Sequence, residues 1–374
     1  MRSLRYAPSL CLCVASLLCS APLLAQPEDE AESAEPEVKA GPSMESEGSD
    51  PVDSEVADED APFVPRGNDS KEKDASEDDT AARLAKRQEK PLGVHGDVLF
   101  GFGKTPLPGP VDRRSTDATV ISLVVGASYL VMPELSLGLD LPWTTASYES
   151  SADQGQIDES ANALGNPMLR LEYRLVKPSF DIPLRFGVGI PVGQGEPDPT
   201  SADRAKLAQT QAQLSADAAR GWREGEYYAV GRMPVTLGGG IEIPGDFEFS
   251  AAETLLLAPK IRGDVSTPER LPDGQTELNS LAMRSVTDVE GAYWFIEQLG
   301  AGLRGSLVYN IIDPVDYTPD AEVTQPSPLQ LSLEPQVRGN YKGVVAFIGY
   351  LIPLGGQLGD AKMSGLRLGA RTNF

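Results

Sequence analysis

The chain has 374 residues, a formal net charge of −23 and one histidine. So acidic a chain lacks the cationic surface that releases counterions from phosphates, which argues against nucleic-acid binding. A single histidine excludes multi-histidine zinc sites. The three cysteines, Cys11, Cys13 and Cys19, lie in a segment that we expect to be removed, which leaves no disulfide, thiolate nucleophile or sulfur ligand. We therefore expect no cofactor and no metal.

The first 25 residues have the pattern of a secretory signal peptide. Arg2 and Arg5 precede an apolar run from Leu10 to Leu24, and Ala25 is a small residue suited to cleavage. A membrane anchor is the alternative, but the run is short for a spanning helix. Lipid attachment at Cys19 is a further alternative. The pattern predicts export, with residues 1–25 as the signal peptide.

Residues 26–92 are acidic and nearly lack aromatic side chains. Between Pro27 and Thr80 there are about 20 acidic and about four basic residues. This composition cannot bury enough apolar surface to offset the conformational entropy of folding, and it predicts a disordered linker in the periplasm. The linker is either a solvated spacer or a tether. A short helix is expected at Ala81–Arg87, next to the domain that follows.

Short alternating segments begin at Gly93, and the turns between them alternate between tight and long. No apolar run of about 18 residues occurs after residue 25, so strands rather than helices must contact lipid. The predicted strands cover 94–102, 118–131, 135–141, 168–176, 180–190, 230–243, 247–261, 280–295, 299–312, 329–339, 342–354 and 366–374.

This rhythm predicts an all-β fold: a transmembrane antiparallel up-and-down β-barrel of about twelve strands over residues 93–374. The tight turns, such as 132–134, 177–179 and 244–246, all fall on one side of the barrel, and the long loops fall on the other. Outer-membrane barrels have short periplasmic turns and longer external loops. We therefore expect a porin-like protein in the outer membrane of a Gram-negative bacterium, with both ends of the barrel on the periplasmic side.

Alternation within the strands separates a lipid face from a lumen face. Leu169, Leu171 and Tyr173 share one face, and the charged residues between them share the other. Glu253 breaks this alternation, so we expect a β-bulge near it. The residues predicted to line the lumen are Asp97, Asp140, Arg170, Glu172, Arg174, Asp181, Arg185, Glu242, Glu248, Arg284, Asp288, Glu290, Arg304, Glu334, Arg338, Arg367 and Arg371.

The predicted lumen therefore mixes acids and arginines in nearly equal numbers. Rings of one sign would select ions, whereas this mixture nearly cancels. Two interpretations stay open: a polar pathway with opposed charges across a constriction, or a salt-bridged filling that keeps the barrel closed.

Aromatic side chains gather near the predicted strand ends, as interfacial girdles require. The set near the short turns is Tyr129, Phe180, Phe247, Phe295 and Tyr341. The set near the long loops is Phe102, Trp143, Tyr228 and Tyr309.

The final strand resembles the C-terminal signal by which the barrel-assembly machinery recognises outer-membrane proteins. Its apolar face ends on an aromatic residue at the C-terminus. The residues of this predicted assembly signal are Leu366, Leu368, Ala370, Thr372 and Phe374.

The segment Gly165–Leu175 resembles a second family. It is similar to the Gly-Asn/Asp-x-x-Leu-x-x-Lys-Tyr-Arg segment of the barrel family associated with a phenol-degradation (MetA) pathway, although Glu172 stands where that family has lysine. The resemblance covers one strand. It implies a barrel that carries small, often hydrophobic solutes.

Two further segments bear on function. Ser201–Arg220 is rich in Ala, Gln and Leu and predicts a helix capped at Ser201, near Asp203. It could fold inward as a plug or cover the barrel from outside, and the surface cover is favoured. His95 is followed by Gly96 and Asp97 without a nucleophilic serine, so it is interpreted as a structural histidine and not as part of an enzyme site.

The sequence thus favours a channel or transporter for small solutes, in contact with outer-membrane lipid. The alternative is a structural or interaction barrel with a closed lumen and a periplasmic acidic tail.

Overall fold

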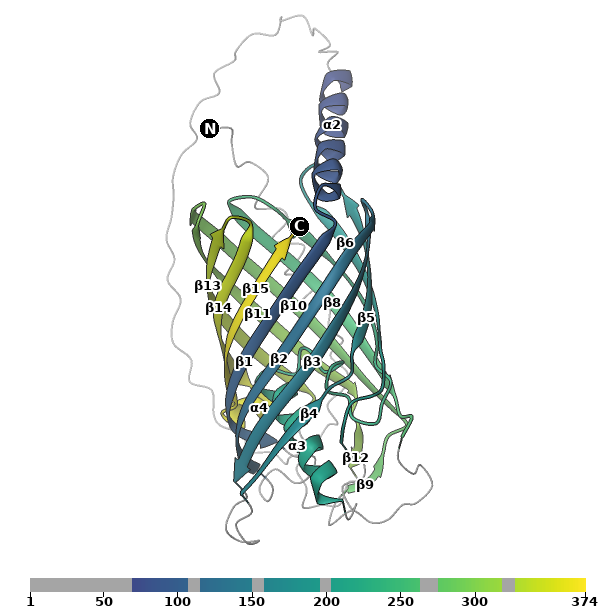
Figure 1. Ribbon diagram of the computed structural model, residues 1–374, viewed down its shortest axis with the longest axis vertical. Helices are drawn as coiled ribbons and strands as arrows, with labels where there is room; N and C mark the ends of the chain where they lie inside the picture. The colour runs from purple at the N-terminus through teal and green to yellow at the C-terminus, as the bar shows by residue number, and fades with distance from the viewer. Residues whose placement is uncertain (1–68, 107–114, 150–157, 196–202, 263–274, 318–326) are drawn as a thin grey trace, which may run out of the picture. The chain divides into compact units, whose positions relative to one another are not determined.

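The computed structural model describes residues 69–106, 115–149, 158–195, 203–262, 275–317 and 327–374. The predicted signal peptide and the acidic linker up to residue 68 lie outside the described residues. Figure 1 shows the strands of the described chain running obliquely around a barrel. The strands of the wall are β1 (Leu92–Pro106), β2 (Ser115–Met132), β3 (Leu135–Glu149), β4 (Asp158–Leu164), β5 (Met168–Val176), β6 (Asp181–Gly189), β7 (Val235–Ile243), β8 (Phe247–Pro259), β10 (Leu281–Ile296), β11 (Leu299–Ile312), β13 (Leu329–Tyr341), β14 (Val344–Gly355) and β15 (Ser364–Asn373).

The wall is closed, and all its neighbouring strands are antiparallel. Going around it, the order is β2-β1-β15-β14-β13-β11-β10-β8-β7-β6-β5-β3, and β3 pairs with β2 to complete the ring. β4 and β5 pair with the two halves of β3, so together they occupy the position of a single strand in the wall. The fold is therefore a closed antiparallel barrel with twelve strand positions, which confirms the predicted architecture.

The break between β4 and β5 was not predicted, because the sequence placed residues up to 162 in a long loop. β3 continues to Glu149, and β4 pairs with this extension. At the break, Pro167 has no N–H for the ladder. The backbone N–H of Asn166 instead donates to the carbonyl of Tyr227, at 2.7 Å. At this break the wall is therefore hydrogen-bonded to a segment inside the barrel.

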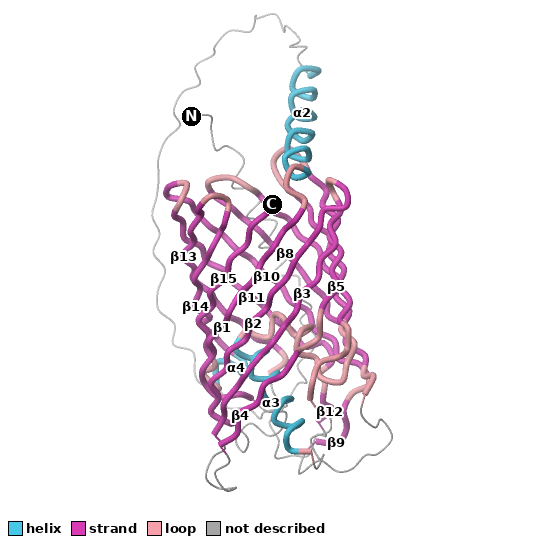
Figure 2. The backbone as a smooth tube through the Cα atoms, in the orientation of Figure 1, coloured by secondary structure: helices cyan, strands magenta, loops and turns pink. Residues whose placement is uncertain are grey.

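Loop length differs between the two ends of the barrel (Figure 2). One end carries the tight turns, the C-terminus and α2 (Asp69–Gln88), which is longer than the expected helix. The other end carries α3 (Arg204–Ala219), α4 (Gly356–Asp360) and a small sheet of β9 (Gln275–Leu278) with β12 (Val315–Tyr317). We call these the turn end and the loop end.

α2 is fastened to the turn end by one arginine. The Arg83 guanidinium pairs with Asp181 at 2.7 Å and also donates to the carbonyl of Lys177. Both partners belong to the β5–β6 hairpin. The C-terminal part of α2 therefore lies against the rim of the barrel.

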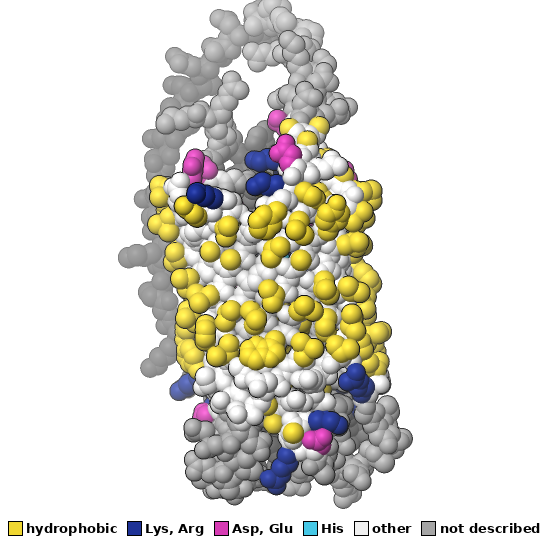
Figure 3. Space-filling model, viewed as in Figure 1, with side chains coloured by type: hydrophobic (Ala, Val, Ile, Leu, Met, Phe, Trp, Pro, Cys, Tyr) yellow, Lys and Arg dark blue, Asp and Glu magenta, His cyan; other side chains and the backbone are white. Residues whose placement is uncertain are grey.

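The outer wall is apolar, as the alternation predicts. Figure 3 shows hydrophobic side chains over the wall and charged side chains toward its two ends. Exposed aromatic residues mark both ends, with Phe247 and Tyr341 at the turn end and Phe102 and Tyr309 at the loop end. Soluble monomers rarely expose so continuous an apolar surface. The chain is thus a transmembrane β-barrel of the outer-membrane type. No helix within the described part of the chain is long and apolar enough to cross a membrane.

The expected bulge at Glu253 is absent. β8 pairs in continuous register with β10 and with β7 on either side of this residue. The side chain keeps the outward parity of Phe247 and Phe249, and it is exposed. The prediction was wrong because it assumed that a carboxylate on this strand would be turned toward the lumen.

Candidate functional site

A loop folded into the loop end of the barrel forms the candidate site. The loop begins with α3. Asp203 caps the N-terminus of this helix, because its side chain accepts a hydrogen bond from the backbone N–H of Lys206 at 3.2 Å. The expected cap, Ser201, lies outside the described residues. α3 packs against β1, β2, β3 and β4. Its buried side includes a row of alanines at helical spacing, namely Ala208, Ala212, Ala216 and Ala219.

Two glycines of the wall let the end of α3 approach closely. Gly101 of β1 and Gly365 of β15 are paired across the ladder. A Cβ at Gly101 would overlap the Cβ of Ala219, and a Cβ at Gly365 would lie 2.8 Å from the Ala219 carbonyl oxygen. The helix can therefore end directly on the inner wall.

The chain turns sharply after α3. Gly221 and Trp222 have positive φ angles of 74° and 59°. The backbone N–H groups of these two residues donate to the carbonyls of Ala218 and Asp217, which closes the end of the helix. Residues 220–228 then run through the barrel interior. The favoured surface cover was wrong: the segment is a plug, because the alanine face and the wall glycines fit closely. We call residues 204–228 the plug.

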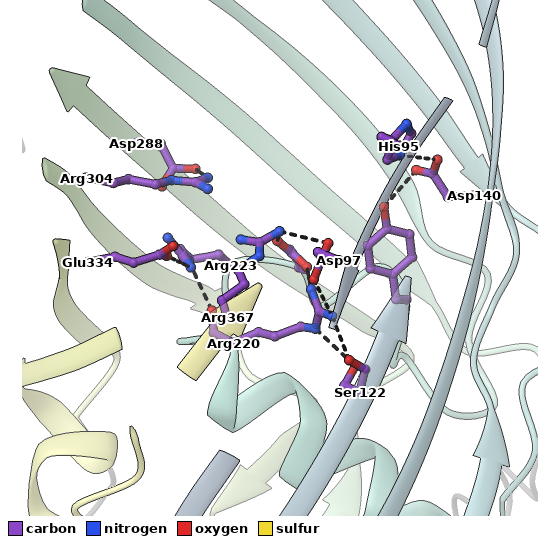
Figure 4. Close-up of polar contacts among 12 residues, drawn as sticks. His95, Asp97, Ser122, Asp140, Arg220, Arg223, Asp288, Arg304, Glu334 and Arg367 are labelled. Atoms are coloured by element: carbon purple, nitrogen blue, oxygen red, sulfur yellow. Dashed lines mark hydrogen bonds and ion pairs between the residues drawn. The ribbon is translucent and has the colours of Figure 1, made fainter. Parts of the chain in front are cut away.

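Four charged residues join the plug to the wall in a closed ring (Figure 4). Arg220 of the plug pairs with Asp97 of β1 at 2.7 Å and with Glu224 at 2.5 Å. Arg367 of β15 pairs with Glu224 at 2.9 Å and with Asp97 at 3.1 Å. The Arg220 Nε also donates to the Ser122 hydroxyl at 3.1 Å. Each charge thus has two opposite neighbours.

A second contact lies on the opposite side of the plug. The Arg223 guanidinium pairs with Glu334 of β13, and both side chains are only 1% exposed. Arg223 also donates to the Ser306 hydroxyl at 3.3 Å. Beside this pair, Arg304 and Asp288 form a two-pronged ion pair with N–O distances of 2.7 and 3.0 Å (Figure 4). The plug is therefore held from β1 across to β13.

The only histidine belongs to a third cluster. His95 Nε2 lies 3.1 Å from Asp140, reaching across Gly126, where a Cβ would overlap both side chains. The Tyr227 hydroxyl donates to the same carboxylate at 2.7 Å, and Arg170 pairs with it as well. His95 therefore lies on the lumenal side of the wall, where its neighbour is the carboxylate of Asp140.

A fourth contact anchors the turn after α3. Arg284 of β10 pairs with Asp217 at 3.0 Å and donates to the Trp222 carbonyl at 2.9 Å. Its guanidinium also lies over the Trp222 ring, 5.8 Å from the ring centroid. A Cβ at Gly225 would overlap this guanidinium. The glycine is therefore needed for the close approach.

Charged residues toward the turn end remain in contact with solvent. Arg174 and Arg185 share the carboxylates of Glu172 and Glu242. Arg185 is 36% exposed and His95 is 42% exposed, whereas Arg220 is fully buried. The lumenal charges toward the turn end are therefore more exposed than the charge that the plug contributes.

Burial and ion pairing shift the pKa values of the plug residues in opposite directions. Burial raises the pKa of Asp217 and of Glu226 above their usual values. For Glu224, the three arginines Arg367, Arg220 and Arg223 outweigh burial and lower its pKa. Burial also raises the pKa of Tyr228 to about 12.

The structure brings nearly all of the predicted lumen residues together. Every one takes part in an ion pair except Arg371, which is exposed at the turn end of β15 and has no ion pair among the described residues. Tyr228 was predicted for the outer girdle, but it is buried in the plug and shares a hydrogen bond with Ser122, at 2.5 Å.

The plug's own charged residues were not predicted. Arg220 and Glu224 stand at a helical i, i+4 spacing, and Arg223 and Glu226 lie in the same short stretch. Three aromatic residues, Trp222, Tyr227 and Tyr228, stand among these charges, which is unusual for a solvated loop. This combination could have indicated that the loop is buried.

The sequence matches no protein-family model, and no curated protein matches it. Several solved barrels are similar in structure. An outer-membrane channel from Pseudomonas putida F1 is 12% identical, with a TM-score of 0.47, covering 75% of this chain and 95% of that chain. The translocator domain of the autotransporter NalP from Neisseria meningitidis is 10% identical, with a TM-score of 0.45, covering 82% and 98%. The NanC porin is 7% identical, with a TM-score of 0.41, covering 75% and 100%.

Proposed function

We propose that this protein is an outer-membrane channel for small solutes and that residues 204–228 close it. The observation that carries the proposal is the contrast along the interior: charged side chains are exposed toward the turn end, whereas Arg220 of the plug is buried in ion pairs. A buried ion pair holds its two side chains together only while both charges are paired and desolvated. Breaking the ion pairs of the plug would therefore release it from the wall, and forming them would return it to the closed position.

The charges of the interior bear on what would pass. Arginines and acids alternate along the predicted lumen, so neither sign dominates and selection by net charge would be weak. Twelve strands make a barrel between the filled eight-stranded and the open sixteen-stranded kinds. We propose small solutes of either charge or none, including the hydrophobic ones that the phenol-pathway family resemblance implies.

The test compares the intact protein with a variant in which a short Gly-Ser linker replaces Arg204–Tyr228. Both are reconstituted in planar bilayers and in liposomes, and swelling is measured with neutral, anionic, cationic and aromatic solutes. We expect low conductance for the intact protein and high conductance with weak charge selectivity for the variant. A variant lacking only Pro27–Asp60 is the control and should behave like the intact protein. No conductance and no swelling from the plug deletion would contradict the proposal.

A closed structural barrel is the second candidate, favoured by the burial of Arg220 and Arg223. In this case the acidic N-terminal segment would carry the function by binding an envelope partner. Pull-down of the full chain and of the chain without Pro27–Asp60 distinguishes the two. A defined partner lost with that segment, together with a silent plug deletion, would favour the structural barrel.

A further inference from the structure

One charged side chain faces outward from the middle of the wall. β8 runs from Phe247 to Pro259, and Glu253 is six residues from each end (253 − 247 = 6; 259 − 253 = 6). Among the strand residues whose side chains are described, the other outward-facing charges, Lys104 and Asp117, lie at the loop end. Glu253 is therefore a carboxylate near the middle of the membrane.

Two hydroxyl groups hold this carboxylate in place. Ser285 and Thr287 of β10 each donate a hydrogen bond to one of its oxygens. Thr287 stands directly opposite Glu253 in the ladder. These contacts fix the side chain on the wall, so that it does not extend along the wall toward the aqueous boundary. They leave acceptor positions free, and no ion pair joins Glu253 to a cation of the described chain.

Several small residues lie beside Glu253 on the outer surface, together with the larger Leu255 and Val289. Gly239 lies opposite it on β7, and Ala251 is its outward neighbour on β8. Gly291 of β10 and Gly305 of β11 continue the same outer surface. Small residues let a second membrane segment approach closely, and polar groups between such segments form hydrogen bonds. The small residues therefore leave room beside Glu253 for a second membrane segment.

The charge decides which partner fits. A charged acidic side chain that faces lipid at mid-membrane depth is unfavourable unless a partner neutralises it. A second copy of this barrel would bring carboxylate against carboxylate, because no outward-facing cation lies away from the strand ends in the described chain. A lysine or arginine from another protein would neutralise Glu253 and use its free acceptor positions.

We propose that the wall around Glu253, with Ser285 and Thr287, is a docking site for a membrane-embedded segment of another protein that presents a lysine or arginine at mid-membrane depth. The site is on the outer face of the barrel and is independent of the plug. A channel that conducts normally and lacks this binding would leave the proposed function intact.

The test uses the full barrel in lipid nanodiscs, labelled with a dye at Glu297→Cys on a short turn. The probe is a synthetic Leu/Ala transmembrane peptide of about 20 residues with one central lysine, carrying the acceptor dye. A second peptide has leucine at the centre. Energy transfer gives the dissociation constant of each peptide as a mole fraction in the bilayer.

We expect the lysine peptide to bind at least about tenfold more tightly than the leucine peptide, a difference of about 1.4 kcal/mol. Glu253→Gln and Glu253→Leu should abolish the preference, and Ser285→Ala with Thr287→Ala should reduce it. Asp360→Asn, at the loop end, is the matched carboxyl-to-amide control. The migration of unheated samples in gels checks that each variant is a folded barrel.

Three outcomes would overturn the proposal: equal binding of the two peptides, a lysine preference that survives in Glu253→Gln, or a dimer of the barrel that Glu253→Leu dissolves. Dodecylamine is the competing amphiphile. If it binds in a Glu253-dependent way as tightly as the lysine peptide, the site belongs to a small cationic amphiphile and not to a protein.

Discussion

Arg220 and Asp97 form a buried ion pair, 2.7 Å between nitrogen and oxygen, that joins the plug to β1. Arg367 contacts the same carboxylate from β15. A buried pair of this kind adds little net stability compared with apolar packing, but removing one partner leaves the other charge desolvated and is strongly unfavourable. The closed state of the plug should therefore respond sharply to single charge deletions.

Replacing Arg220 by alanine should open the plug. Removal of one partner of a buried ion pair is unfavourable by about 3 kcal/mol or more, which corresponds to about a hundredfold change in the closed-to-open equilibrium. Lys206→Ala, at the exposed start of α3, is the matched control. Single-channel recordings should show a much higher open fraction for Arg220→Ala and no change for Lys206→Ala. Equal open fractions would mean that the ring does not hold the plug.

The pair between Arg223 and Glu334 permits a charge exchange. Arg223→Glu places two carboxylates together and should raise the open fraction more than Arg223→Ala does. The double variant Arg223→Glu with Glu334→Arg restores opposite charges and should bring the open fraction most of the way back. If the double variant opens as much as the two single changes combined, the pair is not coupled.

The contact between Gly101 and Ala219 predicts a steric effect. A methyl group at Gly101 overlaps the methyl group of Ala219 and a methyl group of Val120, and such overpacking costs about 1 to 3 kcal/mol. Gly101→Ala should therefore loosen the plug and make Arg204 a faster site for trypsin. Adding Ala219→Gly should partly restore protection. The control is Gly355→Ala, because a Cβ at Gly355 meets nothing within 4 Å.

The barrel itself was predictable because its signals are local. Alternation and turn residues placed β5 at Met168–Val176 and β11 at Leu299–Ile312, as observed. The predicted end of β3 at Leu141 was wrong. β3 runs on to Glu149 because β4 pairs with it, and the pairing partner of a strand cannot be read from that strand's own sequence. Whether the signal peptide, the acidic linker and the C-terminal assembly signal act as expected stays a prediction.

The site was harder to predict because it depends on contacts between distant residues. Alternation within the strands assigns the lumen arginines and acids to a face. Their partners Arg220, Arg223 and Glu224 come from a loop, and alternation within strands does not indicate where a loop folds. The close fit of Ala219 on Gly101 depends on residues 118 positions apart in the chain (219 − 101 = 118). Glu253 was misjudged for a related reason: its hydroxyl partners are on another strand.

Two glutamates of the plug should respond to pH with opposite signs. Burial raises the pKa of Glu226 in the closed state above 4.5, so the closed state binds that proton more tightly than the open state does. Its contribution to closure is present at low pH and is lost as the pH rises through the raised value. The pKa of Glu224 is lowered by its arginines, so its contribution is present above pH 4.5 and is lost as the pH falls below that value.

The open fraction should therefore fall as the pH is lowered from 7.5 toward about 4.5, and rise again in stronger acid. At pH 7.5, Glu226→Gln imitates the protonated form and should favour closure, whereas Glu224→Gln removes a pairing charge and should open the plug by about 3 kcal/mol. Single-channel recordings of both variants check this, and a shift of both in the same direction would show that burial and ion pairing do not control the plug as described.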